Sequence, residues 1–66
     1  MKIKSVTIKI NTTNAAFADG FECEVAGILR NLARKLEDDA TPEQLYDANG
    51  NPVGSVKYSD REVVLN

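Results

Sequence analysis

The sequence predicts a small α+β domain in which an N-terminal strand is followed by one amphipathic helix and a C-terminal β-hairpin (β-α-β-β). Three observations carry this prediction: apolar residues alternate between residues 2 and 10, they recur at helical spacing between residues 21 and 36, and a turn dipeptide follows at Asn49-Gly50. We expect a small antiparallel or mixed sheet of three to four strands with the helix packed on one face. A chain of 66 residues has room for one core, so residues 1–66 should form a single domain.

Residues 2–10 are predicted to form a half-buried strand. Apolar and polar side chains alternate along this stretch, and the apolar set that should face the core is Val6, Ile8 and Ile10. The strand should stop at residues 11–14, because the Asn and Thr side chains there form hydrogen bonds with nearby backbone groups and favour loops.

The next segment has the pattern of an amphipathic helix. We expect Asp19 to be its N-cap, and the apolar residues that recur on one helical face are Phe21, Val25, Ile28, Leu29, Leu32 and Leu36. These residues fill an arc of about 100°, which is the width of a helix face that lies on a sheet. The pattern ends at the acidic run of residues 37–39, and Thr41-Pro42-Glu43 has the sequence of one further short turn.

The C-terminal part is predicted to be a hairpin. Asn49-Gly50 favours a type I′ turn, in which both central residues have positive φ. The returning strand should span residues 53–58, with Tyr46 opposite Val53, and the side chains that should face the helix are Leu45, Val56 and Tyr58. Residues 61–65 are either a short fourth strand or an apolar tail that is available for pairing.

Composition argues against several classes of function. The chain has no histidine and a single cysteine, so one chain cannot assemble a histidine-activated nucleophile, a Cys/His zinc site or an internal disulfide. No stretch of 18 apolar residues exists, and Lys4 and Lys9 interrupt the N-terminal strand, so we expect neither a membrane span nor a signal peptide. We therefore expect a cytoplasmic protein that is not an enzyme and has no catalytic residues, no metal and no cofactor.

The hairpin sequence also places oxygen-bearing side chains at alternate positions, as the start of an EF-hand calcium loop does. The segment runs from Asp47 to Asn51. The motif requires glycine at its sixth position and glutamate at its twelfth, where this chain has Pro52 and Tyr58. A turn explains the same residues, so calcium binding is not expected.

One feature of the helix is not required by packing of the core. Cys23, Gly27, Arg30 and Arg34 recur at i, i+4, i+7 and i+11 on the face opposite the core. Glycine in a helix interior costs about 1 kcal/mol relative to alanine, whereas a small surface lets another backbone approach, and arginines offer forked donors to carboxylate or phosphate groups. This helix stripe is a candidate interaction face; the alternative is a tolerated glycine beside two solvated arginines.

Three segments resemble short uncharacterised proteins encoded by bacteriophages and prophages. They are Asn14-Ala15-Ala16-Phe17, then Glu24-Val25-Ala26-x-Ile28-Leu29-Arg30-x-Leu32-Ala33, then Leu45-x-Asp47-x-Asn49-Gly50-Asn51-x-Val53-Gly54. The resemblance brings no catalytic residues with it. It implies a phage accessory protein in the host-cell cytoplasm, where small acidic folded proteins act by binding and blocking host or defence proteins.

We therefore expect a non-enzymatic protein-interaction module with a protein partner, in a chain whose small core would also gain from forming a homodimer. Inhibition of a host or defence protein is the form of binding that the resemblance implies. The alternative is a dimeric nucleic-acid-binding accessory protein that uses Lys2, Lys4 and Lys9 or the two helix arginines. The formal net charge of −2 makes nucleic acid the weaker choice, and a steep salt dependence of binding would identify it.

Overall fold

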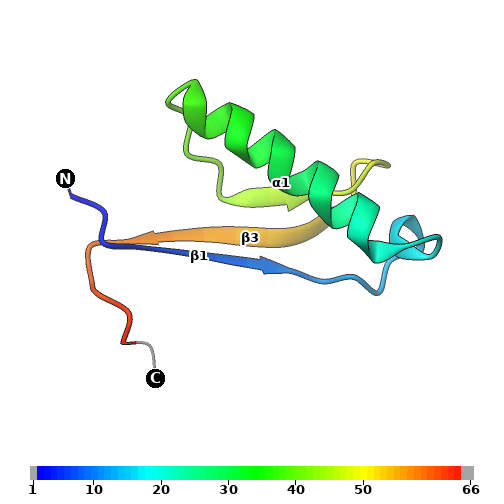
Figure 1. Ribbon diagram of the computed structural model, residues 1–66, viewed down its shortest axis with the longest axis horizontal. Coiled ribbons are helices and arrows are strands. Elements are labelled where there is room, and N and C mark those ends of the chain that lie inside the picture. Colours follow the sequence, from blue (N-terminus) through cyan, green and yellow to red (C-terminus); the bar gives the residue numbers. More distant parts are fainter. Residues whose placement is uncertain (1, 65–66) are drawn as a thin grey trace.

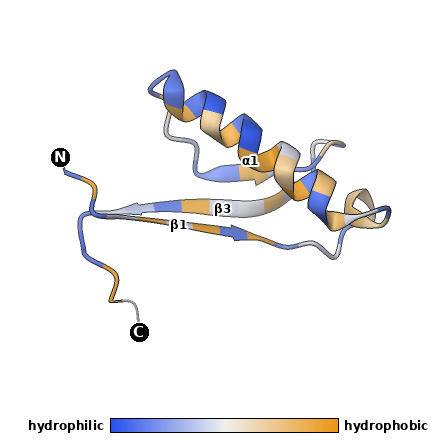
Figure 2. Cartoon of the chain, viewed as in Figure 1, coloured by the Kyte–Doolittle hydropathy of each residue, from blue (hydrophilic) through white to orange (hydrophobic). Residues whose placement is uncertain are grey.

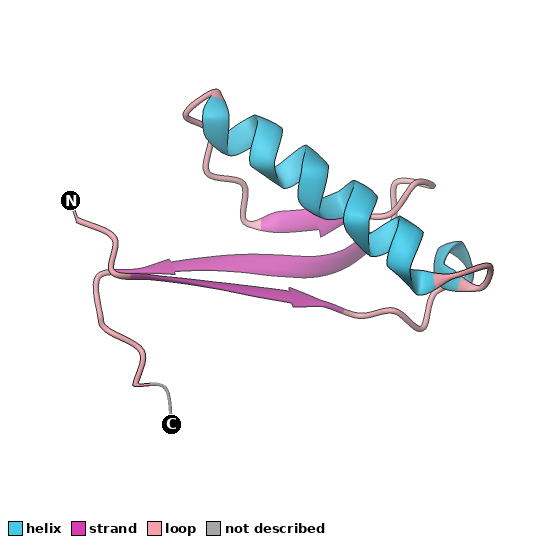
Figure 3. Cartoon of the chain, viewed as in Figure 1, coloured by secondary structure: helices cyan, strands magenta, loops and turns pink. Residues whose placement is uncertain are grey.

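The computed structural model describes residues 2–64 and has a three-stranded sheet with one long helix on one face (Figures 1 and 3). In chain order the elements are β1 (Ser5–Ile10), the 3₁₀ helix η1 (Ala15–Phe17), α1 (Phe21–Glu37), β2 (Gln44–Tyr46) and β3 (Pro52–Ser59). All pairings are antiparallel, which confirms the predicted α+β class. Residues 61–64 form no fourth strand, and Leu65 lies outside the described residues.

The strands lie in the order β1-β3-β2, so β3 is central and the other two strands are the edges. The register of β1 places Val6 opposite Tyr58 and Ile8 opposite Val56. Residues that lie directly opposite one another in an antiparallel pair share a face of the sheet. The alternation predicted for β1 is therefore present, and its apolar residues lie on the face that carries α1.

The ends of α1 are fixed by backbone conformation. Its N-cap is Gly20, which has φ of 130° and makes no side-chain cap, so the prediction of Asp19 as N-cap was wrong. The chain leaves η1 through a sharp turn that needs positive φ before the helix starts, and glycine supplies this conformation most readily. At the other end Asp39 has φ of 63°, and the Ala40 N–H donates to the Lys35 carbonyl oxygen at 2.9 Å, as in a Schellman motif. No turn of helix follows at residues 41–43.

The hairpin between β2 and β3 differs from the predicted type I′ turn. Gly50 has φ of 82°, but Asn49 does not have positive φ. The Asp47 carboxylate accepts hydrogen bonds from the Asn49 and Asn51 N–H groups at 2.8 and 2.9 Å, and the Asp47 carbonyl oxygen accepts one from the Gly50 N–H at 3.0 Å. The loop is therefore the three-residue type, which needs one left-handed residue, and the Asp47 side chain organises it.

A β-bulge follows this loop. Leu45 pairs with Gly54 as predicted, but Tyr46 pairs with Pro52 and not with Val53. Val53 is the extra residue on β3 and is buried in the core. A bulge shifts the alternation of side chains by one residue, which explains how Val53 and Val56, three positions apart on β3, both reach the same core.

The core lies between α1 and the β2–β3 half of the sheet. Its buried apolar residues are Phe17, Ile28, Leu32, Leu45, Val53 and Val56. Ile28 and Leu32 of the helix and Leu45 and Val56 of the sheet were predicted to be core residues, and their burial confirms this part of the prediction. The prediction was wrong for five other residues, which are between 40% and 55% exposed: Val6, Ile8, Phe21, Leu29 and Leu36. The physical reason is that α1 packs over β2 and β3 and leaves most of β1 uncovered (Figure 1), whereas Ile10 at the end of β1 packs against the core.

The Asp47 loop predicts a specific acid sensitivity. Hydrogen bonding from the Asn51 N–H lowers the pKa of Asp47, although partial desolvation opposes this effect. Because the folded-state pKa is depressed, the carboxylate stabilises the fold above its unfolded pKa of about 4, and this contribution is lost as the pH falls through the lowered value. We expect Asp47→Asn to lower the melting temperature by several degrees at neutral pH and to have less effect at low pH. Melts of both proteins across this range measure the difference; parallel curves would contradict it.

Candidate functional site

The uncovered part of the sheet forms one side of the molecule, which we call the open side and define by Val6, Ile8, Leu29 and Leu36. On β1, Val6 is 50% and Ile8 43% exposed. Both side chains lie on the face of the sheet that carries α1, since they pair with Tyr58 and Val56. Figure 2 shows that apolar residues alternate with polar ones along both β1 and α1. The open side therefore exposes apolar groups that one helix is not wide enough to cover.

The two flanks of α1 face different surroundings. On one flank Gly27 and Asn31 border a shallow hollow that the hairpin also lines, and the Glu24 carboxylate accepts a hydrogen bond from the Ala48 N–H at 2.8 Å. At about 100° per residue, Leu29 and Leu36 lie on the opposite flank. Since β2 and β1 are opposite edges of the sheet, this second flank is the one beside β1.

The backbone of β1 is unpaired on its outer edge within the described sheet. The Asn11 N–H donates to the Val53 carbonyl oxygen at 2.7 Å, and the register continues without a shift to Ser5 opposite Ser59. In an antiparallel ladder alternate residues bond to the same neighbour, so the odd-numbered residues of β1 bond to β3. The residues whose N–H and C=O groups point to the free edge are therefore Val6, Ile8 and Ile10. Free backbone groups and exposed apolar side chains thus coincide at Val6 and Ile8, whereas the Ile10 side chain is half-buried against the core.

The helix stripe lies on the outward surface of α1. Cys23, Arg30 and Arg34 are exposed, whereas Gly27 is half-buried beside the hairpin. A Cβ built at Gly27 would meet no atom within 4 Å, and the Arg34 guanidinium donates only a long 3.5 Å hydrogen bond to the Asn31 side chain. The structure therefore places three stripe residues on a solvated surface and Gly27 at its border with the hollow.

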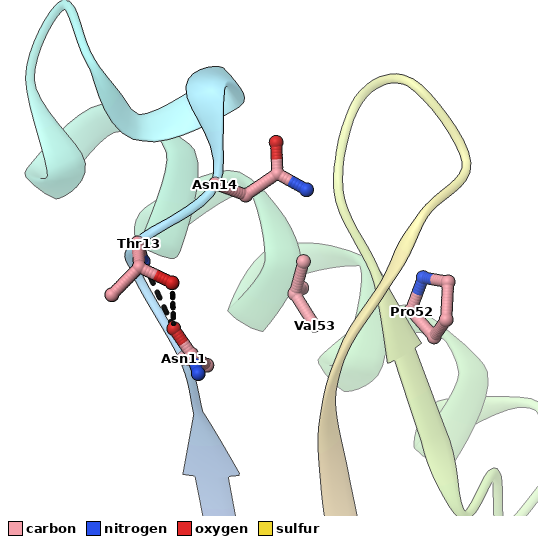
Figure 4. Close-up of a pocket in the computed structure, with 5 residues that line it drawn as sticks. All are labelled: Asn11, Thr13, Asn14, Pro52 and Val53. Atoms are coloured by element: carbon pink, nitrogen blue, oxygen red, sulfur yellow. Dashed lines mark hydrogen bonds between the residues drawn. The ribbon is translucent and has the colours of Figure 1, made fainter.

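A second hollow lies where β1 ends, next to the start of β3 (Figure 4). Its polar side chains are already used by the loop: the Asn11 side-chain oxygen accepts hydrogen bonds from the Thr13 N–H and hydroxyl at 2.9 and 2.7 Å. The Asn14 side-chain oxygen accepts one from the Ala16 N–H at 3.2 Å. These side-chain oxygens hold the loop in shape, which gives the polar lining of this hollow a structural explanation.

The part of the chain that the structure describes contains no group of three or more His, Cys, Asp or Glu side chains placed to hold a metal ion. Among residues 2–64, no helix combines the length and apolar composition needed to cross a bilayer. The features that stand out are therefore the open side and the free edge of β1.

No protein-family model, curated protein or solved structure matches this chain.

Proposed function

We propose that this chain is a small non-enzymatic protein-interaction module and that the open side is its binding surface. The observation that supports this proposal is the coincidence, on β1, of a free backbone edge with half-exposed Val6 and Ile8. Folded proteins usually protect an edge strand with a lysine that points across it, a proline, a bulge or a covering segment. Here Lys9 lies on the face opposite α1, because it pairs with Ser55 and alternates with Ile8.

The mode of binding that fits this surface is strand addition. An extended segment of the partner would bond to the backbone of Val6, Ile8 and Ile10, which supplies affinity without sequence specificity. Its alternate side chains would meet the apolar groups of β1 and of the adjacent helix flank, which supplies specificity. In the phage context that the resemblance implies, the partner is a host or defence protein in the cytoplasm, and occupancy of its own strand edge would inhibit it.

A capture experiment tests the proposal. Tagged wild-type protein is compared with Ile8→Lys, which places a charge in the open side while leaving the core untouched, because Ile8 is 43% exposed. Val64→Lys is the matched control: Val64 is 83% exposed and lies outside β1. We expect a protein captured from host lysate by wild type and Val64→Lys to be lost with Ile8→Lys. Capture that is equal in all three would contradict binding at the open side.

The helix stripe is the other candidate contact surface, and Gly27→Glu tests it. We expect thermal stability to hold or rise, because a Cβ at this position meets no atom within 4 Å and glycine costs about 1 kcal/mol in a helix interior. The same change places bulk and negative charge beside Arg30 and Arg34. Weakened capture at unchanged stability would assign the contact to the stripe; unchanged capture would leave the stripe as solvated surface. A melt and an affinity measurement on the same variant decide between these results.

Nucleic-acid binding is the second candidate function, and one observation favours it. The sheet face opposite α1 carries two lysines and a tyrosine but no carboxylate; its strand residues are Ser5, Thr7, Lys9, Gln44, Tyr46, Pro52, Ser55, Lys57 and Ser59. The net charge of −2 opposes this function. Titration of single-stranded DNA or RNA at two salt concentrations tests it, since binding through phosphates weakens steeply as salt rises.

A further inference from the structure

We propose that a second copy of this chain pairs with the free edge of β1, so that two sheets join across a two-fold axis beside Ile8. This inference rests on the proposed function, because it names one partner for the open side. It would produce a six-stranded antiparallel sheet in which each β1 is covered at its edge by the other.

The edge of β1 is complementary to itself. A two-fold axis at Ile8 places Ile8 opposite Ile8 of the second copy and Val6 opposite Ile10 of the second copy. These are the residues whose backbone groups point outwards, so every pair can exchange both of its N–H···O=C bonds. The same register keeps all the apolar side chains on the α1 face and places Lys9 opposite Thr7, so that no like charges face each other directly. A closed two-fold contact of this kind ends with two copies.

Neighbouring registers are less favourable. An axis at Lys9 would put two lysines directly opposite one another. An axis at Thr7 would place Ile10 opposite Lys4, whose N–H already donates to the Ser59 carbonyl oxygen at 2.8 Å and so faces inwards. A shift of the strand pairing by a single residue, which would place Ile8 opposite Thr7 or Lys9 of the second copy, would pair apolar side chains of one copy with polar ones of the other. The axis at Ile8 is therefore the one that uses the whole edge.

The size of the contact sets the expected affinity. A standard interface buries about 800 Å² per partner and uses roughly 20–30 residues on each side. The strand contributes six residues, and Leu29 and Leu36 add the helix flank beside them. The interface therefore falls at the small end of the range, where association is weak and reversible. We expect a dimer with a Kd on the order of micromolar, which also gives further burial to a core in which no side chain is fully enclosed.

Sedimentation equilibrium on the whole chain tests the association. From about 1 µM to about 1 mM, wild type should pass from monomer to dimer, and Ile8→Lys should weaken the dimer by tenfold or more. Circular dichroism and a melt on Ile8→Lys establish that the monomer remains folded. Val64→Lys should dimerise as wild type does, since the proposed contact does not include the tail. Loss of the dimer in Val64→Lys but not in Ile8→Lys would overturn the proposal.

Disulfide trapping tests the register. In a Cys23→Ser background, Ile8→Cys is compared with Thr7→Cys under oxidation by air and copper phenanthroline. Directly opposite, hydrogen-bonded residues have Cα atoms about 5.5 Å apart, within the range of about 4.4–6.8 Å that a disulfide spans. We expect a covalent dimer from Ile8→Cys and much less from Thr7→Cys. The reverse result would move the axis and contradict the proposed register.

The two proposals fail in different ways. A wild-type chain that stays monomeric over the whole concentration range overturns the homodimer. If Ile8→Lys nevertheless loses a captured protein that Val64→Lys retains, the open side is still a binding surface and its partner is a different protein. If the chain dimerises and captures no other protein, the open side serves self-association alone.

Discussion

Gly54→Ala is expected to lower the free energy of unfolding by about 1–3 kcal/mol, which is a large share of the roughly 3–5 kcal/mol that a core of this size supplies. Gly54 pairs with Ile10 on one side and with Leu45 on the other, at the bulge in β3. A Cβ there would overlap the Lys9 carbonyl oxygen and lie 3.3 Å from the Ile10 Cα. Because both obstacles are backbone atoms, neither can rotate away, and β1 would have to move away from β3.

Gly27→Ala is the matched control for this substitution. It adds the same methyl group, but in a place where no atom lies within 4 Å, and it should stabilise the protein by up to about 1 kcal/mol through helix propensity. Urea unfolding of both variants, followed by circular dichroism, measures the two free energies. If Gly54→Ala proved as stable as wild type, β1 could not lie as close to β3 as the structure places it.

The fold class follows from local patterns that are strong in this sequence. Helical spacing identified Ile28 and Leu32 as inward-facing residues, and both are buried. Strand alternation correctly placed Leu45 opposite Gly54 and Val56 on the helix side. These features depend on which residues share a face of one element, and periodicity reports that directly.

The turn type and the start of the helix were harder to predict from the sequence, because several side chains compete there for the same backbone groups. Asn49-Gly50 is a strong type I′ signal, but the Asp47 carboxylate accepts two N–H groups of the loop and favours the three-residue turn. The turn is therefore one residue longer than predicted. The bulge at Val53 compensates for this extra residue, so that Leu45 still pairs with Gly54. At the helix start, the need for positive φ at Gly20 outweighed the capping preference of Asp19.

The open side could not be found from periodicity, because a pattern shows which residues share a face but not which strands the helix covers. Val6 and Ile8 have the alternation of core residues, yet β1 is the edge strand beyond the helix. The signal that the sequence does contain is an excess: six apolar helix positions and three on β1 are more than one short helix–sheet contact can bury. The helix stripe was identified as outward-facing, and Cys23, Arg30 and Arg34 are indeed exposed.

Leu32→Ala is expected to cost about 2–5 kcal/mol and so to leave little or no folded protein at room temperature. Leu32 is 3% exposed and packs in the cluster that joins α1 to β2 and β3, so truncation leaves a cavity that the short strands have little freedom to fill. Leu29→Ala removes the same atoms from the same helix, but Leu29 is 40% exposed on the open side, so its cost should stay below about 1 kcal/mol.

This pair of variants also tests the premise of the functional proposals. Both are measured by urea unfolding at a concentration low enough to keep the chain monomeric, so that any dimer contact at Leu29 does not contribute. A large difference between them means that one flank of α1 carries the core while the other is free for a partner. Equal losses would mean that α1 covers β1 in solution, in which case Val6 and Ile8 would be core residues and no open side would exist to bind anything.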